Sequence, residues 1–194
     1  MQQVRRGSSW SGYERNCSFL NTGGRFVGAS HVSGLDFQDD GRGLAVTDWD
    51  QDGDLDLWFS NRTAPRLRLM LNQSSRQRPA QHVAFRLVGS ECNRDAIGAV
   101  VELHLEHSGE PVPRLVRSVR AGDLFLSQSS KWIHFGMPEN ATVASVSVLW
   151  PGGSRSNWSG ITAGQRYLLR QGESSARQES GDHPRRVSLD TTPL

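Results

Sequence analysis

One short stretch of the sequence concentrates the side chains best suited to chemistry. Residues 48–56 read Asp-Trp-Asp-Gln-Asp-Gly-Asp-Leu-Asp. Carboxylates at positions 1, 3 and 5 of a tight loop direct oxygens toward one centre, and Gly53 at position 6 allows the sharp turn that brings them together. A hard cation that accepts about six to eight oxygen ligands fits such a loop, and calcium fits it better than magnesium. We expect ligation by the side chains of Asp48, Asp50, Asp52 and Asp56 and by the backbone carbonyl of Asp54.

The remaining positions of this loop exclude other metal sites. An EF-hand closes its site with a bidentate Glu at position 12 and is flanked by helices, whereas position 12 is Phe59 and both flanks have the pattern of strands. The loop has no His or Cys, so a zinc or copper site is disfavoured. A solvated acidic turn is the alternative, but five aspartates in nine residues would repel one another without a cation. We expect the metal to have a structural role.

A second set of polar residues lies in loops of the C-terminal half. These residues would line a ligand site, or else hydrogen-bond the backbone of their own loops. Ser127 and Ser129 near His134 supply two parts of a hydrolytic triad, but no G-x-S-x-G elbow surrounds either serine, and we predict no catalytic residue. The possible ligand-binding residues are Asn93, Arg94, Ser127, Gln128 and His134.

Composition and charge exclude several classes of protein. The 194 residues carry 22 Lys and Arg against 20 Asp and Glu, a net charge of +2, and the basic residues are dispersed, which disfavours nucleic-acid binding. No apolar run approaches the roughly 18 residues of a membrane span. The first residues have no apolar segment, so we expect any export signal to lie outside this chain. Cys17 and Cys92 cannot form a disulfide scaffold, although a single bridge and two free thiols both remain open.

The elements that must position these residues are strands. Short period-two runs alternate with Gly, Asn and Asp breaks, which indicates an all-β protein. A polar segment closed by Pro79 separates two modules. The expected strands are 16–21, 25–29, 43–48, 55–61 and 66–72 before this segment, and 82–88, 99–106, 114–121, 131–135, 143–150, 156–158 and 166–170 after it.

The first module resembles the FG-GAP or VCBS repeat, the calcium-binding unit of integrin-type β-propellers. The resemblance rests on the carboxylate loop together with Cys17-Ser18-Phe19-Leu20-Asn21 and Gly34-Leu35-Asp36. In that family each blade has four strands and carries such a loop between two of them. One blade cannot close a ring of about four to eight, so the resemblance implies either upstream blades or docking on the second module.

The second module is similar to the ASPIC/UnbV domain, which follows such repeats in proteins of that type. The matching segments begin with Cys92-Asn93-Arg94-Asp95-Ala96-Ile97-Gly98-Ala99 and continue with residues 121–130, His134-Phe135-Gly136 and Trp150-Pro151-Gly152-Gly153. Met137-Pro138 and Gly152 depart from the usual family pattern. Both departures fall in loops, so we expect them to reshape a loop and leave the fold unchanged.

Together these features predict one β-propeller-like blade with a calcium loop, followed by a small antiparallel β-sandwich or barrel. The predicted function is a non-enzymatic, calcium-stabilised binding or adhesion module of an exported, periplasmic or cell-surface protein. Its partner would be a protein, a glycan or upstream propeller blades. An enzyme or biosynthetic accessory that uses the polar loop residues is the alternative. The predicted boundaries are an N-terminal extension at 1–12, the repeat at 13–73, a linker at 74–80, the ASPIC/UnbV-like domain at 81–172 and a disordered tail at 173–194.

Overall fold

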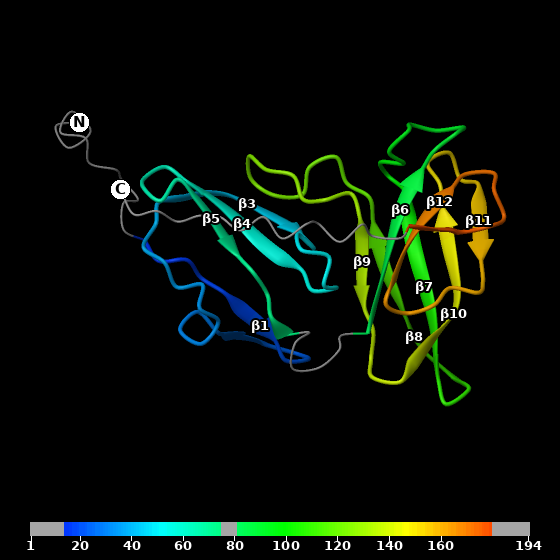
Figure 1. The fold of residues 1–194 in the computed structure, drawn as a ribbon, viewed down its shortest axis with the longest axis horizontal. Coiled ribbons are helices and arrows are strands. Elements are labelled where there is room, and N and C mark those ends of the chain that lie inside the picture. The colour runs from blue at the N-terminus through cyan, green and yellow to red at the C-terminus, as the bar shows by residue number, and fades with distance from the viewer. Residues whose placement is uncertain (1–13, 75–80, 180–194) are drawn as a thin grey trace.

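A computed structural model describes residues 14–74 and 81–179 of the chain. In these ranges the protein is all-β and contains no α-helix, as the sequence predicts. Two bodies of strands lie side by side, the first formed by the N-terminal strands and the second by the C-terminal strands (Figure 1). The predicted N-terminal extension and nearly all of the predicted linker lie outside the described residues.

The first module consists of a hairpin and a three-stranded antiparallel sheet. The hairpin pairs β1 (Phe19–Asn21) with β2 (Phe26–Gly28), and Gly23 and Gly24 take positive φ in the turn between them. The sheet has the order β3-β4-β5, formed by β3 (Gly41–Thr47), β4 (Asp56–Asn61) and β5 (Leu67–Met70). The hairpin and the sheet are separate, so the described strands do not form one four-stranded blade.

The second module contains two four-stranded sheets. One has the order β11-β10-β7-β8 and the other the order β13-β12-β6-β9. The strands are β6 (His82–Val88), β7 (Val100–His107), β8 (Glu110–Ser118), β9 (Ile133–Gly136), β10 (Ala141–Leu149), β11 (Arg155–Trp158), β12 (Gln165–Arg170) and β13 (Arg177–Glu179).

The two sheets of the second module share one apolar core. Alternation along β7 buries Val101, Leu103 and Leu105 on one face, as a strand with one covered face requires. Phe85 and Trp150 are almost fully buried and come from opposite layers of the same cluster. The module is therefore a two-layer arrangement, and no barrel closes among the described strands.

Two details of this module differ from the sequence-based expectation. Strands β6 and β12 pair in parallel, whereas an antiparallel module was expected, because alternation predicts that a strand exists and not which strand it pairs with. The tail was expected to be disordered from residue 173, but Arg177–Glu179 form β13 and pair with β12. This strand lacks apolar residues, so backbone hydrogen bonding along the free edge of β12 holds it. The rest of the predicted tail, residues 180–194, lies outside the described residues.

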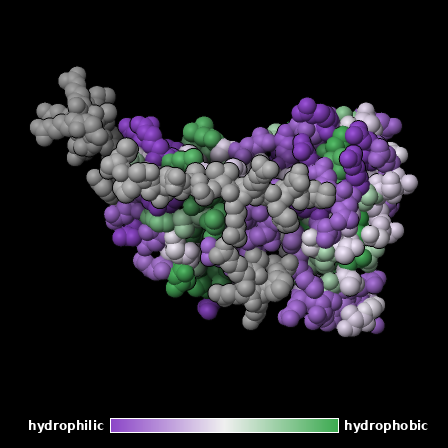
Figure 2. All heavy atoms as spheres, in the orientation of Figure 1, coloured by the Kyte–Doolittle hydropathy of each residue, from purple (hydrophilic) through white to green (hydrophobic). Residues whose placement is uncertain are grey.

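The first module has almost no apolar core of its own. Its buried residues are polar, namely Asp40, Asp54, Asp56 and Asn61, whereas Phe19, Phe26 and Val32 are 64%, 72% and 88% exposed. Apolar side chains accordingly appear on the surface of this module in Figure 2. Because apolar burial is the main force that stabilises a fold, this module depends on other interactions.

Candidate metal centre and module contact

The carboxylate loop connects β3 to β4, as its position between two predicted strands requires. Thr47 and Asp56 are paired at the ends of these antiparallel strands, so the strands fix both ends of the loop. Within the loop Gln51 has a φ of 60° and Gly53 a φ of 94°. Both residues occupy the left-handed region, which tightens the turn, and at Gly53 the backbone adopts it without steric cost.

Three of the five predicted ligands converge. Carboxylate oxygens of Asp48, Asp50 and Asp56 all lie within 4.8 Å of one another. Asp56 is fully buried, and its two oxygens accept hydrogen bonds from the backbone N–H groups of Trp49 (2.8 Å) and Asn72 (2.8 Å), two residues that are themselves exposed. Each of these oxygens keeps a second lone pair for a cation.

The other two aspartates of the loop are engaged differently. Asp52 accepts a hydrogen bond from the backbone N–H of Asp54 (2.9 Å), and a carboxylate oxygen of Asp54 accepts one from the Ser74 hydroxyl (3.2 Å). Neither carboxylate belongs to the three-residue group. The structure therefore brings together Asp48, Asp50 and Asp56, and does not place the side chain of Asp52 with them.

The electrostatics of the three-residue group fit a cation. Burial raises the pKa of Asp48, and the opposing influence of Arg166 does not cancel this effect. Burial and the neighbouring charges of Asp52 and Asp56 raise the pKa of Asp50. One buried oxygen of Asp48 and one of Asp50 have no hydrogen-bond partner. Buried carboxylate oxygens without donors are costly, and a divalent cation would satisfy them.

The aspartates that precede the loop form ion pairs with arginine side chains. Asp36 pairs with Arg15 (3.0 Å), Asp39 with Arg68 (2.8 Å) and Asp40 with Arg42 (2.9 Å). The acidic region thus divides into an ion-paired part and the convergent group of the loop. The sequence showed Arg42 as the only nearby cation, because Arg15 and Arg68 reach these acids through the fold.

The carboxylate loop also contacts the second module. His134 on β9 donates a hydrogen bond through Nε2 to the carbonyl oxygen of Gly53 (2.7 Å), because a carbonyl oxygen can only accept. A side chain at Gly53 would overlap the ring of His82, which stacks on His134 with a centroid distance of 5.2 Å. The carboxylate loop is therefore packed against a histidine pair of the second module.

A second contact joins the free edge of β3 to residues 127–130. Ser127 donates a hydrogen bond to the carbonyl of Leu44, and the backbone N–H of Val46 donates to the hydroxyl of Ser129 (3.1 Å). The backbone N–H of Ser130 donates to the carbonyl of Val46 (3.1 Å). The long loop between β8 and β9 reaches toward the first module in Figure 1. It supplies β3 with hydrogen bonds that an edge strand otherwise lacks.

The possible ligand-binding residues of the second module do not form one site. Asn93 closes its own loop by donating to the carbonyl of Ile97 (2.9 Å) and accepting from its N–H (2.7 Å). Arg94 pairs with Asp95 (3.1 Å) and is largely exposed. Ser127 and His134 hydrogen-bond the first module, and Gln128 and His134 line a cavity to which Arg94 does not contribute.

The serine and histidine of the hydrolytic hypothesis are also engaged elsewhere. Ser127 donates to Leu44, Ser129 accepts from Val46, and Nε2 of His134 donates to Gly53. No serine–histidine hydrogen bond links them in the described part of the chain. Cys17 and Cys92 are free thiols, so the single bridge left open by the sequence is not formed.

The fold and these contacts define a two-module all-β protein whose first module carries a convergent carboxylate group. Residues 89–176 match the family model of ASPIC and UnbV. The match confirms the resemblance of the second module. No curated protein matches the chain. No helix in the described ranges is both long enough and apolar enough to span a membrane.

Proposed function

We propose that this protein is a calcium-stabilised, non-enzymatic binding module of an exported or cell-surface protein. The observation that carries the proposal is the convergence of Asp48, Asp50 and Asp56, two of which present buried oxygens without donors. Calcium accepts oxygen ligands at 2.3–2.6 Å in flexible geometry. The carbonyl of Asp54 and water would complete its coordination.

The first module is best understood as a repeat of the FG-GAP or VCBS type. It has a β-hairpin, a three-stranded sheet and the carboxylate loop between two antiparallel strands. It exposes Phe19 and Phe26 and buries polar residues. This is typical of a repeat unit that needs a neighbour to bury its apolar face. Upstream blades, or another chain, would supply that neighbour.

The binding role rests on the large loops of the second module. The segment between β8 and β9 exposes Phe125 (73%) and Leu126 (80%), and Leu126 has a φ of 51°. Apolar side chains at the tip of an exposed loop are common in surfaces that recognise a partner. The enzyme alternative receives no support from the geometry, since Arg94, Gln128 and His134 do not converge on one pocket.

Calcium titration followed by thermal melting tests the metal. A ligand that binds the folded form alone stabilises it by about 2.7 kcal/mol at 100 times its dissociation constant. We expect calcium to raise the melting temperature of the wild type and to have a much smaller effect on Asp50→Asn. The matched control is Asp36→Asn, which removes an ion-paired aspartate of the same module and should keep the full response to calcium. A wild-type protein that calcium does not stabilise contradicts the proposal.

A further inference from the structure

A cavity among the described residues lies between the two modules and takes only Leu55 from the carboxylate loop. Its volume is about 680 Å³, within the roughly 300–1,000 Å³ typical of small-molecule sites. Val46 and Leu55 of the first module form one wall. The second module supplies the rest from the end of β8, the loop before β9, the start of β9 and Val100 at the start of β7. Cavities between modules are common sites of ligand binding.

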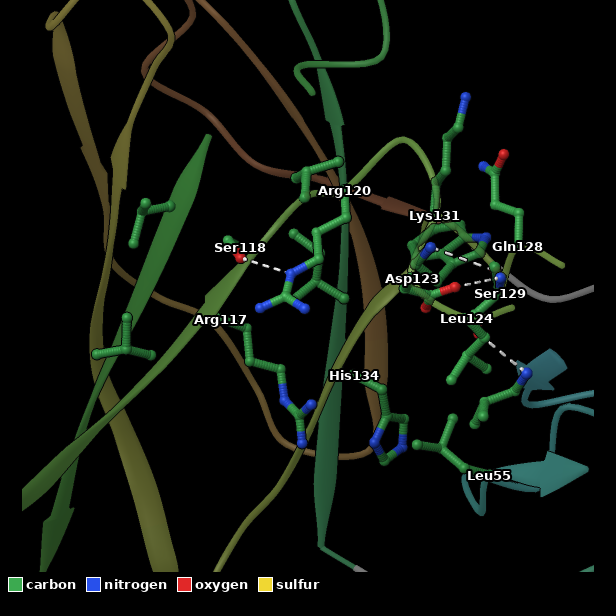
Figure 3. Close-up of a pocket in the computed structure, with 17 residues that line it drawn as sticks. Leu55, Arg117, Ser118, Arg120, Asp123, Leu124, Gln128, Ser129, Lys131 and His134 are labelled. Carbon is green, nitrogen blue, oxygen red and sulfur yellow. Dashed lines mark hydrogen bonds between the residues drawn. The ribbon is translucent and has the colours of Figure 1, made fainter. Parts of the chain in front are cut away.

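Two arginines face this cavity, and neither forms an ion pair with a carboxylate in the part of the chain that the structure describes. Arg117 and Arg120 extend from the same wall, and the Arg117 guanidinium points toward His134 (Figure 3). Arg117 contributes to lowering the pKa of His134, which places its positive charge close to that ring. In the described ranges, Arg120 makes a long hydrogen bond from Nε to the Ser118 hydroxyl (3.5 Å).

The lining also contains two other charged residues, Lys131 and Asp123. Lys131 forms an ion pair with Asp95, and its side chain extends away from the two arginines in Figure 3. Asp123 accepts a hydrogen bond from the backbone N–H of Ser129 (3.0 Å), which holds the loop in place. Among the described residues, Arg117 and Arg120 therefore present two positive charges to the cavity against the single carboxylate of Asp123, which leaves a net positive charge.

The rest of the lining is suited to the body of a small molecule. Val100, Val116, Val119 and Leu124 contribute apolar surface next to the arginines. Guanidinium groups bind carboxylates through parallel, charge-assisted hydrogen bonds, which adds geometric specificity to the attraction.

We infer that this cavity binds a small organic carboxylate, with the acid group held by Arg117 and Arg120 and a ring-sized body on the apolar wall. The inference deepens the proposed binding role and rests on it, but none of the predicted calcium ligands lines the cavity. A free aromatic acid and an acidic sugar both carry this chemistry.

Titration of the full chain by amide NMR tests the inference, with benzoate and glucuronate as probes and benzamide and glucose as their uncharged counterparts. We expect one of the two acids to shift the amide signals of residues 116–120 and 131–134 in a saturable manner. The uncharged counterpart should bind at least about tenfold more weakly, because charge-assisted hydrogen bonds are lost. A response to benzoate alone assigns an aromatic acid, and a response to glucuronate alone assigns an acidic sugar.

The arginine variants make the test specific to this cavity. Arg117→Ala combined with Arg120→Ala should weaken binding by at least about tenfold. Arg86→Ala, which removes an exposed arginine of β6 outside the cavity, should leave binding unchanged. All three side chains are exposed, so unchanged melting temperatures would verify folding. The inference is overturned if neither acid shifts these signals, or if the double variant binds as the wild type does. The calcium response is measured separately, by thermal melting, so its absence would contradict the proposed metal and leave the acid titration to decide the cavity.

Discussion

Nε2 of His134 lies 2.7 Å from the carbonyl oxygen of Gly53, and this hydrogen bond joins the carboxylate loop to the sheet of the second module. Gly53 is one of two loop residues whose positive φ tightens the turn, so a position that shapes the candidate metal centre also docks it. Order in the loop and contact between the modules are therefore coupled through one peptide group.

Gly53→Ala should destabilise the protein for two reasons. Alanine at a φ of 94° is strained, and its Cβ would overlap the His82 ring. We expect a loss of about 2 kcal/mol or more, since a left-handed backbone alone costs about 1–2 kcal/mol. Urea unfolding checks this value. Gly122→Ala is the control, because a Cβ there meets no atom within 4 Å and the residue does not have positive φ. Equal effects of the two substitutions would contradict the docking role of Gly53.

His134 should make stability depend on pH. Burial lowers its pKa in the folded protein below 6.5, and the nearby His82 and Arg117 act in the same direction, while Asp54 and the bond to Gly53 oppose them less strongly. The unfolded state therefore binds more protons, so this contribution is complete above pH 6.5 and is lost as pH falls through the folded-state pKa.

His134→Gln isolates the histidine contribution to this pH dependence. The glutamine amide can still donate to Gly53 but does not titrate. We expect the free energy of unfolding of the wild type to fall more steeply than that of the variant between pH 7.5 and pH 5, measured in urea with a chelator present. Parallel pH profiles for the two proteins would show that His134 is not the titrating group.

The sequence predicted the strands well and their partners poorly. All twelve expected strands are present, because alternation and turn residues are local signals. The parallel pairing of β6 with β12 depends on contacts between residues about 80 positions apart, which no local pattern encodes. Strand β13 was missed because Arg177, Gln178 and Glu179 lack the apolar alternation that identifies a strand.

For the candidate site, spacing within the loop predicted the carboxylate group but not its surroundings. Asp48, Asp50 and Asp56 converge because the turn at Gly53 is local. The contacts of Ser127 and His134 with the first module could not be predicted, since they depend on how two modules dock. The sequence predicts both residues as possible ligand-binding residues. A polar loop residue that binds a ligand and one that hydrogen-bonds a distant backbone group look alike in the sequence.

Asp56→Ala should reveal how much the loop depends on backbone hydrogen bonds in the absence of metal. The substitution leaves the N–H groups of Trp49 and Asn72 without their acceptor. Each lost hydrogen bond is worth about 1 kcal/mol, so we expect a loss of about 2 kcal/mol by urea unfolding in chelator. Asp56→Asn removes the same charge but keeps one carbonyl acceptor, so its loss should be clearly smaller. Equal losses would indicate that charge and not hydrogen bonding holds Asp56 in place.

The contact along β3 predicts a local change in hydrogen exchange. Val46 donates its N–H to the hydroxyl of Ser129, on the edge of the sheet that no other strand of the first module covers. Ser129→Ala removes that acceptor, and Ser127→Ala removes the donor to Leu44. Each lost hydrogen bond is worth about 1 kcal/mol, so the double variant should lose about 2 kcal/mol.

Amide exchange measured by NMR distinguishes this contact from a general loss of stability. We expect the Val46 amide to exchange markedly faster in Ser129→Ala, whereas amides of β4 that pair with β5 should keep their protection. Ser159→Ala, which changes an exposed serine after β11, serves as the control and should leave Val46 protected. If Val46 keeps its protection in Ser129→Ala, the loop does not hold the edge of β3 in solution, because exchange of this amide requires its hydrogen bond to open.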